Sequence, residues 1–341
     1  MQTFRANGKL LISGEYFVLD GATALAVPTQ KGQTLQVEKS NTNDIHWQSQ
    51  LIDGSVWFEC RFDANTLAIS YQTDEAVAIR LMKMLRYAKS ENSNFLIENG
   101  LKITTRLEFQ QDWGLGSSST LVCTIAKWAK VDAFQLLFNS MKGSGYDIAC
   151  GMTDAPLLYQ IKQQTPKVQI VDFKPIFSNQ LYFVHLGKKQ NSREGIARYR
   201  EKSALQQLPI STINDLTKAF LEVNDIASFN KIIFEHEQIV ANIIELPRAK
   251  DLFFKDYTYG EIKSLGAWGG DFILVSSDTN FKFTKEYFTQ KGFSTILPYA
   301  KMILESHLIY ILFSFHFRLI SAKIQLNKNQ SIIYQKLTNS I

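Results

Sequence analysis

The sequence has 341 residues, of which 45% are hydrophobic and 20% are charged. This composition excludes a disordered chain, and 18 glycines and three cysteines are too few for a collagen-like or disulfide-dense protein. The net charge is +5, and the segment from His307 onward contributes Lys and Arg but no Asp or Glu. Because the remainder is almost neutral, a nucleic-acid partner is not expected.

The length predicts two domains. We expect an N-terminal nucleotide-binding domain over residues 1–175, a second domain over 176–300, and an extension of unknown role over 301–341. Within the extension, Leu308–Phe317 is an apolar run too short for the roughly 20 residues that span a bilayer. We interpret it as a buried strand or helix, with an interfacial anchor as the alternative, and expect no stable membrane insertion.

The three cysteines are widely separated, and the N-terminus does not begin with a basic stretch followed by an apolar one. Both features are typical of a cytoplasmic protein, in which the thiols are reduced.

In chain order, the first predicted strand is Thr34–Glu38. Ala76–Ala88 has the spacing of a helix, and Leu101–Phe109 alternates as a strand does. A polar, glycine-rich turn over Gln110–Ser119 then leads to a second predicted helix at Leu121–Lys130.

The second half of the chain also mixes strands with helices. Strands are predicted at Leu181–Leu186, Phe272–Val275 and Phe293–Leu297, and helices at Ile213–Val223, Phe229–Ile244 and Phe281–Lys291. This order does not repeat a strand–helix–strand unit. It therefore predicts an α+β protein rather than a regular α/β array.

The strongest local feature is the segment from Asp112 to Thr120, DWGLGSSST, between a predicted strand and a predicted helix. Gly114 and Gly116 allow the backbone to approach a ligand closely, and the first helical turn presents unpaired N–H groups. Together they favour an anion such as a nucleotide phosphate. The segment lacks the lysine of a Walker loop and the third glycine of a dinucleotide fingerprint. A polar turn with a serine cap is the alternative.

Three other glycine-bearing segments accompany this loop: ANGKLLISGEY at 6–16, GSGYDIA at 143–149 and KSLGAWGGD at 263–271. In this order and spacing, the four segments resemble the GHMP kinase superfamily, which includes galactokinase, homoserine kinase, mevalonate kinase and phosphomevalonate kinase. The string GYDIA at 145–149 is similar to that of the bacterial GYDIA family. The resemblance covers roughly residues 4–300.

The resemblance implies a two-domain α+β fold, with an N-terminal domain like the second domain of ribosomal protein S5 and a ferredoxin-like C-terminal domain. It also implies the cofactors ATP and Mg²⁺. The implied ATP-binding residues are Gly114, Leu115, Gly116, Ser117, Ser118 and Ser119, with Ser118 also ligating Mg²⁺. The implied catalytic residues are Asp147, as the base, and Lys9, near the base and the acceptor hydroxyl.

On the acceptor side, the resemblance assigns Glu15, with Tyr16 beside it, to substrate binding. It also implies an active-site glycine loop that comprises Gly266, Ala267, Gly269 and Gly270. Ser192 and Arg193 follow a predicted strand together with Lys188 and Lys189. These residues could line an anionic substrate pocket or form a solvated basic loop.

The chain also departs from the family pattern. Asn7 stands where the first motif usually has proline, and Trp268 and Asp271 interrupt the third motif. The acidic metal ligand expected eleven residues before Asp147 is replaced by Leu136. The second Mg²⁺ ligand is therefore unassigned, and the metal could be held mainly by ATP and Ser118.

These features predict an ATP-dependent kinase that phosphorylates the hydroxyl of a small molecule, with mevalonate as the expected acceptor. The alternatives are a phosphomevalonate kinase, a mevalonate diphosphate decarboxylase, and a degenerate kinase fold that binds nucleotide without transfer. The sequence leaves open whether the protein is a homodimer.

Overall fold

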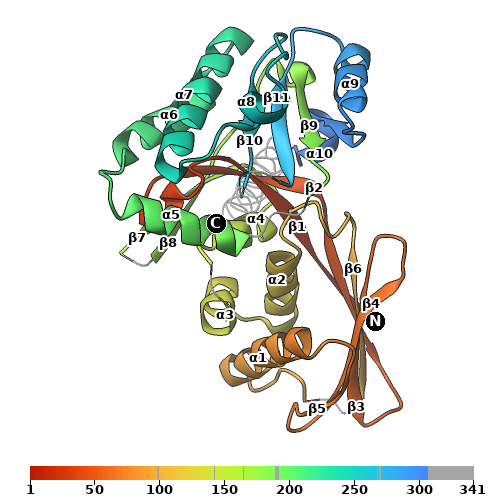
Figure 1. Ribbon diagram of the computed structural model, residues 1–341. Coiled ribbons are helices and arrows are strands. Elements are labelled where there is room, and N and C mark those ends of the chain that lie inside the picture. The colour runs from red at the N-terminus through yellow and green to blue at the C-terminus, as the bar shows by residue number, and fades with distance from the viewer. Residues whose placement is uncertain are drawn as a thin grey trace, which may run out of the picture. The chain divides into compact units, whose positions relative to one another are not determined.

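The computed structural model describes residues 1–305, apart from 98–99, 142, 164, 189–191, 267 and 269. Nearly all of these residues belong to one compact unit, Met1–Leu304. The predicted apolar segment Leu308–Phe317 lies outside the described residues. Figure 1 shows the order of the elements along the chain.

Residues 2–170 supply an eight-stranded mixed sheet in which only β3 and β6 pair in parallel. The long strand β2 pairs with β1 on one side, and with β6 and β7 on the other. The strands are β1 (Gln2–Ser13), β2 (Ala24–Lys39), β3 (Asp44–Gln50), β4 (Val56–Asp63), β5 (Ile69–Gln72), β6 (Leu101–Leu107), β7 (Leu157–Lys162) and β8 (Thr165–Ile170).

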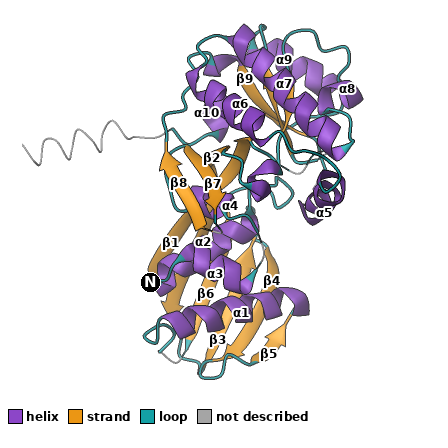
Figure 2. Ribbon diagram, turned by 90° about the vertical axis from the view of Figure 1, so that its left-hand side faces the viewer, coloured by secondary structure: helices purple, strands orange, loops and turns teal. Residues whose placement is uncertain are grey.

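Helices α1 to α4 accompany this sheet, and Figure 2 shows them on one of its faces. The sheet residues Trp47 and Phe58 pack with the helix residues Leu81, Ile125 and others in one buried apolar cluster. The helices are α1 (Glu75–Glu91), α2 (Ser117–Ala129), α3 (Ala133–Ser140) and α4 (Tyr146–Gly151), and a short 3₁₀ turn, η1, covers Phe17–Asp20. The burial of one helix face against a sheet is the usual way to stabilise such layers.

Residues 181–298 supply a second, four-stranded antiparallel sheet with the order β10-β11-β9-β12. Its strands are β9 (Leu181–His185), β10 (Ile262–Ser264), β11 (Phe272–Ser276) and β12 (Ile296–Pro298). The helices after β8 are α5 (Ser192–Ser203), α6 (Ile210–Glu222), α7 (Ile226–Ile244), α8 (Ala249–Phe253), α9 (Phe281–Gln290) and α10 (Tyr299–Met302), with a 3₁₀ turn, η2, at Ser178–Gln180. These elements follow one another as strand, helices, two strands, helix and strand, and this order is a ferredoxin-like arrangement.

The predicted α+β class is confirmed, and each predicted helix overlaps an observed one. One expectation was wrong in detail: the polar turn predicted over Gln110–Ser119 ends at Gly116, because Ser117–Ser119 form the first turn of α2. The predicted strand Phe293–Leu297 is observed as Ile296–Pro298. The three cysteines are buried and free, as expected. The expected domain boundary near residue 175 stays a prediction, although the change of sheet falls between Ile170 and Leu181.

Candidate active site

The predicted phosphate loop lies at the start of α2. Gly114 and Gly116 have φ angles of +66° and +88°, in the left-handed region that favours glycine. Gly116 caps the helix, so the N–H groups of the first turn point out of the helix end. The backbone N–H of Lys9 donates to the carbonyl of Leu115 at 3.1 Å and fixes the loop to β1. The loop therefore has the geometry expected of an anion site.

Asp147 lies in the first turn of α4, opposite the serine run. Ser119 Oγ donates to its Oδ2, and the N–H of Ile148 donates to its Oδ1 at 3.0 Å. Gly145, the residue before this helix, has a φ of +92°, and a Cβ there would lie 2.8 Å from the Tyr159 hydroxyl. The 143–145 segment thus turns tightly and brings the carboxylate to the loop.

Lys9 extends from β1 between these two elements. Its ammonium donates to the carbonyl of Gly114 at 2.8 Å and lies 5.6 Å from the centre of the Tyr146 ring. Burial acts to lower the pKa of Lys9, but Tyr146, Asp147 and Asp271 outweigh that effect and raise it. The side chain therefore stays charged at neutral pH.

One cavity of about 340 Å³ joins all three parts. Lys9, Ser118, Asp147 and Gly266 line it, with Arg193 from the start of α5. Residues far apart in the sequence are thus brought to one place, as the sequence predicts.

Two smaller cavities adjoin this one. One, of about 240 Å³, shares Ser117 and Ser118 with it and is otherwise lined mainly by apolar and aromatic side chains, including Trp57 and Met84. The other, of about 70 Å³, contains Glu15 and Tyr16. The first pocket was not predicted, since its residues come from β2, β3, β4, β6, α1, α2 and two loops.

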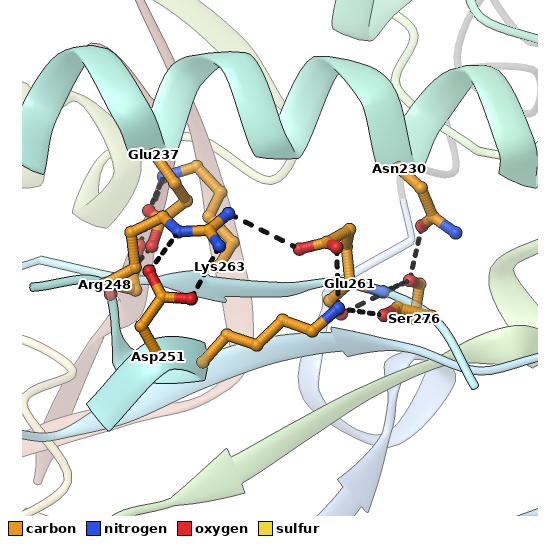
Figure 3. Close-up of polar contacts among 10 residues, drawn as sticks. Asn230, Glu237, Arg248, Asp251, Glu261, Lys263 and Ser276 are labelled. Carbon is orange, nitrogen blue, oxygen red and sulfur yellow. Dashed lines mark hydrogen bonds and ion pairs between the residues drawn. The ribbon is translucent and has the colours of Figure 1, made fainter. Parts of the chain in front are cut away.

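The predicted acceptor residue Glu15 lies in a buried charged cluster. Its carboxylate pairs with the ammonium of Lys263, which is also 3.7 Å from Glu237 of α7. Figure 3 shows Lys263 beneath Glu237. Burial raises the pKa of Glu237 to about 7 and also raises the pKa of Glu15, although Lys263 opposes both shifts. Glu15 is therefore both a cavity residue and part of a structural ion cluster, which the sequence did not predict.

Tyr16, the second predicted acceptor residue, has a φ of +63° and stacks on Tyr199 of α5 at 5.4 Å between ring centres. Burial raises its pKa to about 12. This stacking packs the second half of α5 against the turn after β1. Arg193 reaches the large cavity from that helix, whereas the Ser192 side chain is not among those described.

The glycine loop reaches the cavity through Gly266, which has a φ of +63°. Gly270 is buried, and the predicted residues Ala267 and Gly269 lie outside the described residues. Trp268 is 3% exposed and packs near Tyr16 and Tyr199 in a common apolar cluster. Asp271, noted in the sequence only as a departure, is a cavity residue.

The oxygen donors fit Mg²⁺ in kind, because a serine hydroxyl and carboxylates are the hard ligands that this ion prefers. Ser118, Asp147 and Asp271 all line the cavity. Among the described residues, no three or more His, Cys, Asp or Glu side chains gather closely enough to form a metal site by themselves. Phosphate oxygens of a nucleotide and water would have to supply the remaining ligands of the ion. In the same part of the chain, no helix has the length and apolar character needed to cross a membrane.

No family model matches the sequence, and no curated protein does. Solved structures, in contrast, match over most of the chain. Methanococcus jannaschii mevalonate kinase has a TM-score of 0.67 at 13% identity, covering 89% of this chain and 98% of its own. Streptococcus pneumoniae phosphomevalonate kinase, in complex with phosphomevalonate and AMPPNP, has a TM-score of 0.60 at 17% identity, and the match covers 86% of this chain and 98% of that one. Lactococcus lactis galactokinase, complexed with galactose, has a TM-score of 0.64 at 13% identity, and the match covers 85% of this chain and 89% of that one. The chain therefore has the two-domain fold of the GHMP kinases.

Proposed function

We propose that this chain is a GHMP-type kinase of the GYDIA branch, which transfers the γ-phosphoryl group of ATP to the hydroxyl of mevalonate. The observation that carries this proposal is the single cavity lined by the serine-rich start of α2, Lys9 and Asp147. The shared fold with several small-molecule kinases supports it.

In this proposal, the triphosphate binds against the first turn of α2. Backbone N–H groups of residues 117–119 and the helix dipole stabilise its negative charge. Ser118, which is exposed at this turn, and the carboxylates of the cavity are the groups that would hold Mg²⁺. The ion, when bound, neutralises charge on the phosphates. The aromatic pocket that shares Ser117 and Ser118 would receive the adenosine part.

The acceptor hydroxyl lies next to Asp147 in this reading. Asp147 accepts its proton as the new oxygen–phosphorus bond forms and the bond from the γ-phosphorus to the bridging oxygen of ATP breaks. Ser119 donates to the same carboxylate and fixes its orientation. Lys9 stays charged and stabilises the negative charge of the transferring group.

The small cavity supports a branched aliphatic acceptor over a sugar. Its volume is about 70 Å³, and four of its nine lining residues are aliphatic: Leu11, Val18, Leu19 and Ile196. A sugar needs a hydrogen-bond partner for most of its hydroxyl groups, and a site that leaves them unpaired loses affinity. Mevalonate has a methyl-bearing carbon chain and fewer polar groups, so it suits this lining better.

Phosphomevalonate is the second candidate acceptor. Arg193 lines the large cavity, and a guanidinium pairs well with a phosphate. Both acceptors are tested with purified protein, ATP and Mg²⁺, with galactose and homoserine beside them, by measuring ADP release and the phosphorylated product. Turnover of neither mevalonate nor phosphomevalonate would contradict the pathway assignment.

The base assignment is tested with Asp147→Asn. We expect kcat to fall by about 100- to 10,000-fold, because general-base catalysis contributes that much, while the Kd of Mg-ATP changes by less than about threefold. Asp112→Asn is the matched control, since Asp112 is an exposed acid of the same loop and does not line the cavity. Full activity of Asp147→Asn would exclude the proposed base.

A further inference from the structure

The pairing of β1 with β2 is irregular just before Lys9. The register shifts between Asn7 and Lys9, and residues 29–31 of β2 lie opposite Gly8 alone. Such an irregularity re-aims the side chains that follow it. Beyond it, the N–H of Lys9 donates to the Leu115 carbonyl of the phosphate loop. The direction of Lys9 therefore depends on how β1 is held at the residue where the regular pairing ends, which is Asn7.

The side chain of Asn7 is buried and has partners for both ends of its amide. It is 4% exposed, and its Oδ1 accepts from Arg5 Nη1. Its Nδ2 donates to the Thr153 carbonyl at 2.8 Å and to Asp154 Oδ1 at 2.7 Å. Because a guanidinium can only donate, Arg5 requires the amide oxygen on its own side. The NH₂ group is thereby directed at the two acceptors, and the orientation of the amide is fixed.

These two acceptors lie just after α4, the helix that carries Asp147. Thr153 Oγ1 donates back to the Ala149 carbonyl at 3.0 Å and so fixes the acceptor segment to the helix. Because α4 has only six residues, a displacement of its end also displaces its first turn. Asn7 therefore joins the strand that carries Lys9 to the helix that carries Asp147.

Asn7 is also a position at which the chain departs from the family pattern, which usually has proline there. Proline has no side-chain donor. It would leave the Thr153 carbonyl and the Asp154 carboxylate without the hydrogen bonds that tie them to β1. The surroundings of position 7 are thus built for an amide, and this departure has a structural reason.

We propose that Asn7 is a positioning residue for phosphoryl transfer, and that its amide sets the placement of the Lys9 ammonium relative to the Asp147 carboxylate. This rests on the proposed function, in which Lys9 stabilises the transferring group and Asp147 accepts the hydroxyl proton. Asn7 does not line the cavity, so it touches neither nucleotide nor acceptor. Its loss should slow the transfer step, since a misplacement of about 1 Å can cost about 100-fold, and should leave substrate binding unchanged.

The test compares Asn7→Ala with the wild type in the full chain, with Mg-ATP and whichever of mevalonate, phosphomevalonate, galactose and homoserine the wild type phosphorylates. We expect kcat to fall by about 10- to 100-fold. The acceptor KM, and the Kd of Mg-ATP from calorimetry, should each change by less than about threefold, because no cavity residue is altered.

Asn92→Ala is the matched control. The Asn92 amide likewise ties two segments together, since its Nδ2 donates to the Ala129 carbonyl at 2.7 Å, but Asn92 does not line the cavity and contacts neither β1 nor α4 through this bond. Its loss should lower the melting temperature and leave kcat unchanged. A general loss of stability is thereby separated from a loss of positioning.

Asn7→Asp provides a second route, because it keeps the size of the side chain and the Arg5 contact. Its other oxygen would face the Thr153 carbonyl and the Asp154 carboxylate, both of which only accept, so kcat should fall as in Asn7→Ala. Adding Asp154→Asn supplies a donor opposite the new carboxylate. The double variant should therefore regain at least about fivefold in kcat over Asn7→Asp, since a charge-assisted hydrogen bond again joins the two segments.

The outcomes separate this inference from the kinase proposal. An active wild type with an unchanged kcat in Asn7→Ala and Asn7→Asp overturns the inference and leaves the kinase proposal intact. A change confined to the acceptor KM or the Kd of Mg-ATP overturns it in the same way. If Asn7→Ala does not fold, the Asp154→Asn rescue decides, and its failure to restore kcat also overturns the inference. A wild type that phosphorylates none of the four acceptors overturns both proposals.

Discussion

At the scale of single residues, Gly114 connects backbone geometry with the chemistry of the cavity. It has a positive φ, its carbonyl accepts from Lys9, and the Asp271 carboxylate lies over its Cα. Any side chain at this position would meet both backbone strain and a collision. Gly187 has a similar φ of +71° but open space around it, so the two glycines separate the effects.

We predict that Gly114→Ala lowers the free energy of unfolding by roughly 2–5 kcal/mol, the sum of left-handed strain and overpacking. Gly187→Ala should cost only the strain, about 1–2 kcal/mol. Urea denaturation of both variants measures the difference. In an Asp271→Gly background the excess cost at Gly114 should disappear. Equal costs of the two glycine substitutions in the wild-type background would mean that the carboxylate does not lie over Gly114.

The sequence predicted which residues gather at the cavity better than it predicted their contacts. Lys9, Ser118 and Asp147 were assigned through the resemblance that the four glycine-bearing segments carry, and all three line one cavity. The bond from Ser119 to Asp147 and the approach of Asp271 could not be predicted, because each joins segments whose distance depends on the packing of the elements. No local periodicity reports such a contact.

At the scale of elements, a buried ion cluster joins the end of β1 to β10 and α7. Lys263 contacts Glu15 and Glu237, and Ser264 Oγ donates to Glu237 at 2.9 Å. The N–H of Gly14 donates to His236 Nε2 at 3.1 Å, so that nitrogen carries no proton. Burial and Lys263 accordingly lower the pKa of His236 well below its usual value. Near this cluster, Arg248 at the N-cap of α8 pairs with Glu261, the residue before β10. Ser276 Oγ accepts from the N–H of Glu261 and donates to Asn230 of α7 (Figure 3).

Lys263→Met should be strongly destabilising. Its removal leaves two carboxylates without their shared cation in a site of at most 1% exposure, and breaking a buried pair in this way costs about 3–5 kcal/mol. Lys218→Met is the matched control, because Lys218 is an exposed lysine of α6 that pairs with Glu222; it should change stability by less than about 0.5 kcal/mol. Chemical denaturation measures both. If Lys263→Met lowers stability no more than Lys218→Met does, the ammonium of Lys263 does not stabilise the buried carboxylates.

Glu237 also predicts a dependence of stability on pH. Its pKa rises from 4.5 to about 7 on folding, so between these values the folded state holds a proton that the unfolded state has lost. Stability contributed by Glu237 is thus fully present below pH 4.5 and is lost as pH rises toward 7, by at most about 1.4 kcal/mol per pH unit. The stability of wild type minus that of Glu237→Gln should therefore fall across this window and stay flat above it. The pKa of His236 is lowered on folding, so its contribution to stability changes with pH in the opposite direction. His236 is present in both proteins, so its contribution cancels in the difference. A difference independent of pH would refute the raised pKa.

Elements with clear periodicity were predicted well, and those without it were not. The strand β6 alternates, and helices α6 and α7 follow a helical spacing, so their ends fall within a few residues of the prediction. The strand β1 was missed because its second half is buried on both faces and does not alternate. The short helix α4 was read only as a glycine segment, since six residues give too little periodicity.

At the scale of the whole described unit, the two sheets share one apolar core. Leu10 and Val27 of the first sheet pack in the same buried cluster as Phe183 and Leu274 of the second. The Glu15–Lys263 pair adds a buried polar link between them. Neither link can be recognised in the sequence. The sequence therefore predicts a boundary near residue 175, but it does not show that each of the two parts is stabilised by the other.

This shared core predicts that residues 1–175 do not fold alone. Separated from the second sheet, the fragment would expose the β1 and β2 side chains of the common cluster, among them Ile12 and Leu25, both fully buried in the whole chain. Each large aliphatic side chain of this kind loses about 1.5–3 kcal/mol when exposed, and several such losses exceed the 5–15 kcal/mol that stabilises a typical domain. We expect the fragment to bind a hydrophobic dye and to melt without a cooperative transition, whereas the full chain melts in one step when followed by circular dichroism and by Trp fluorescence. A sharp, reversible transition in the fragment would mean that the first sheet is stable by itself, and that the cavity is assembled from two independently folded domains.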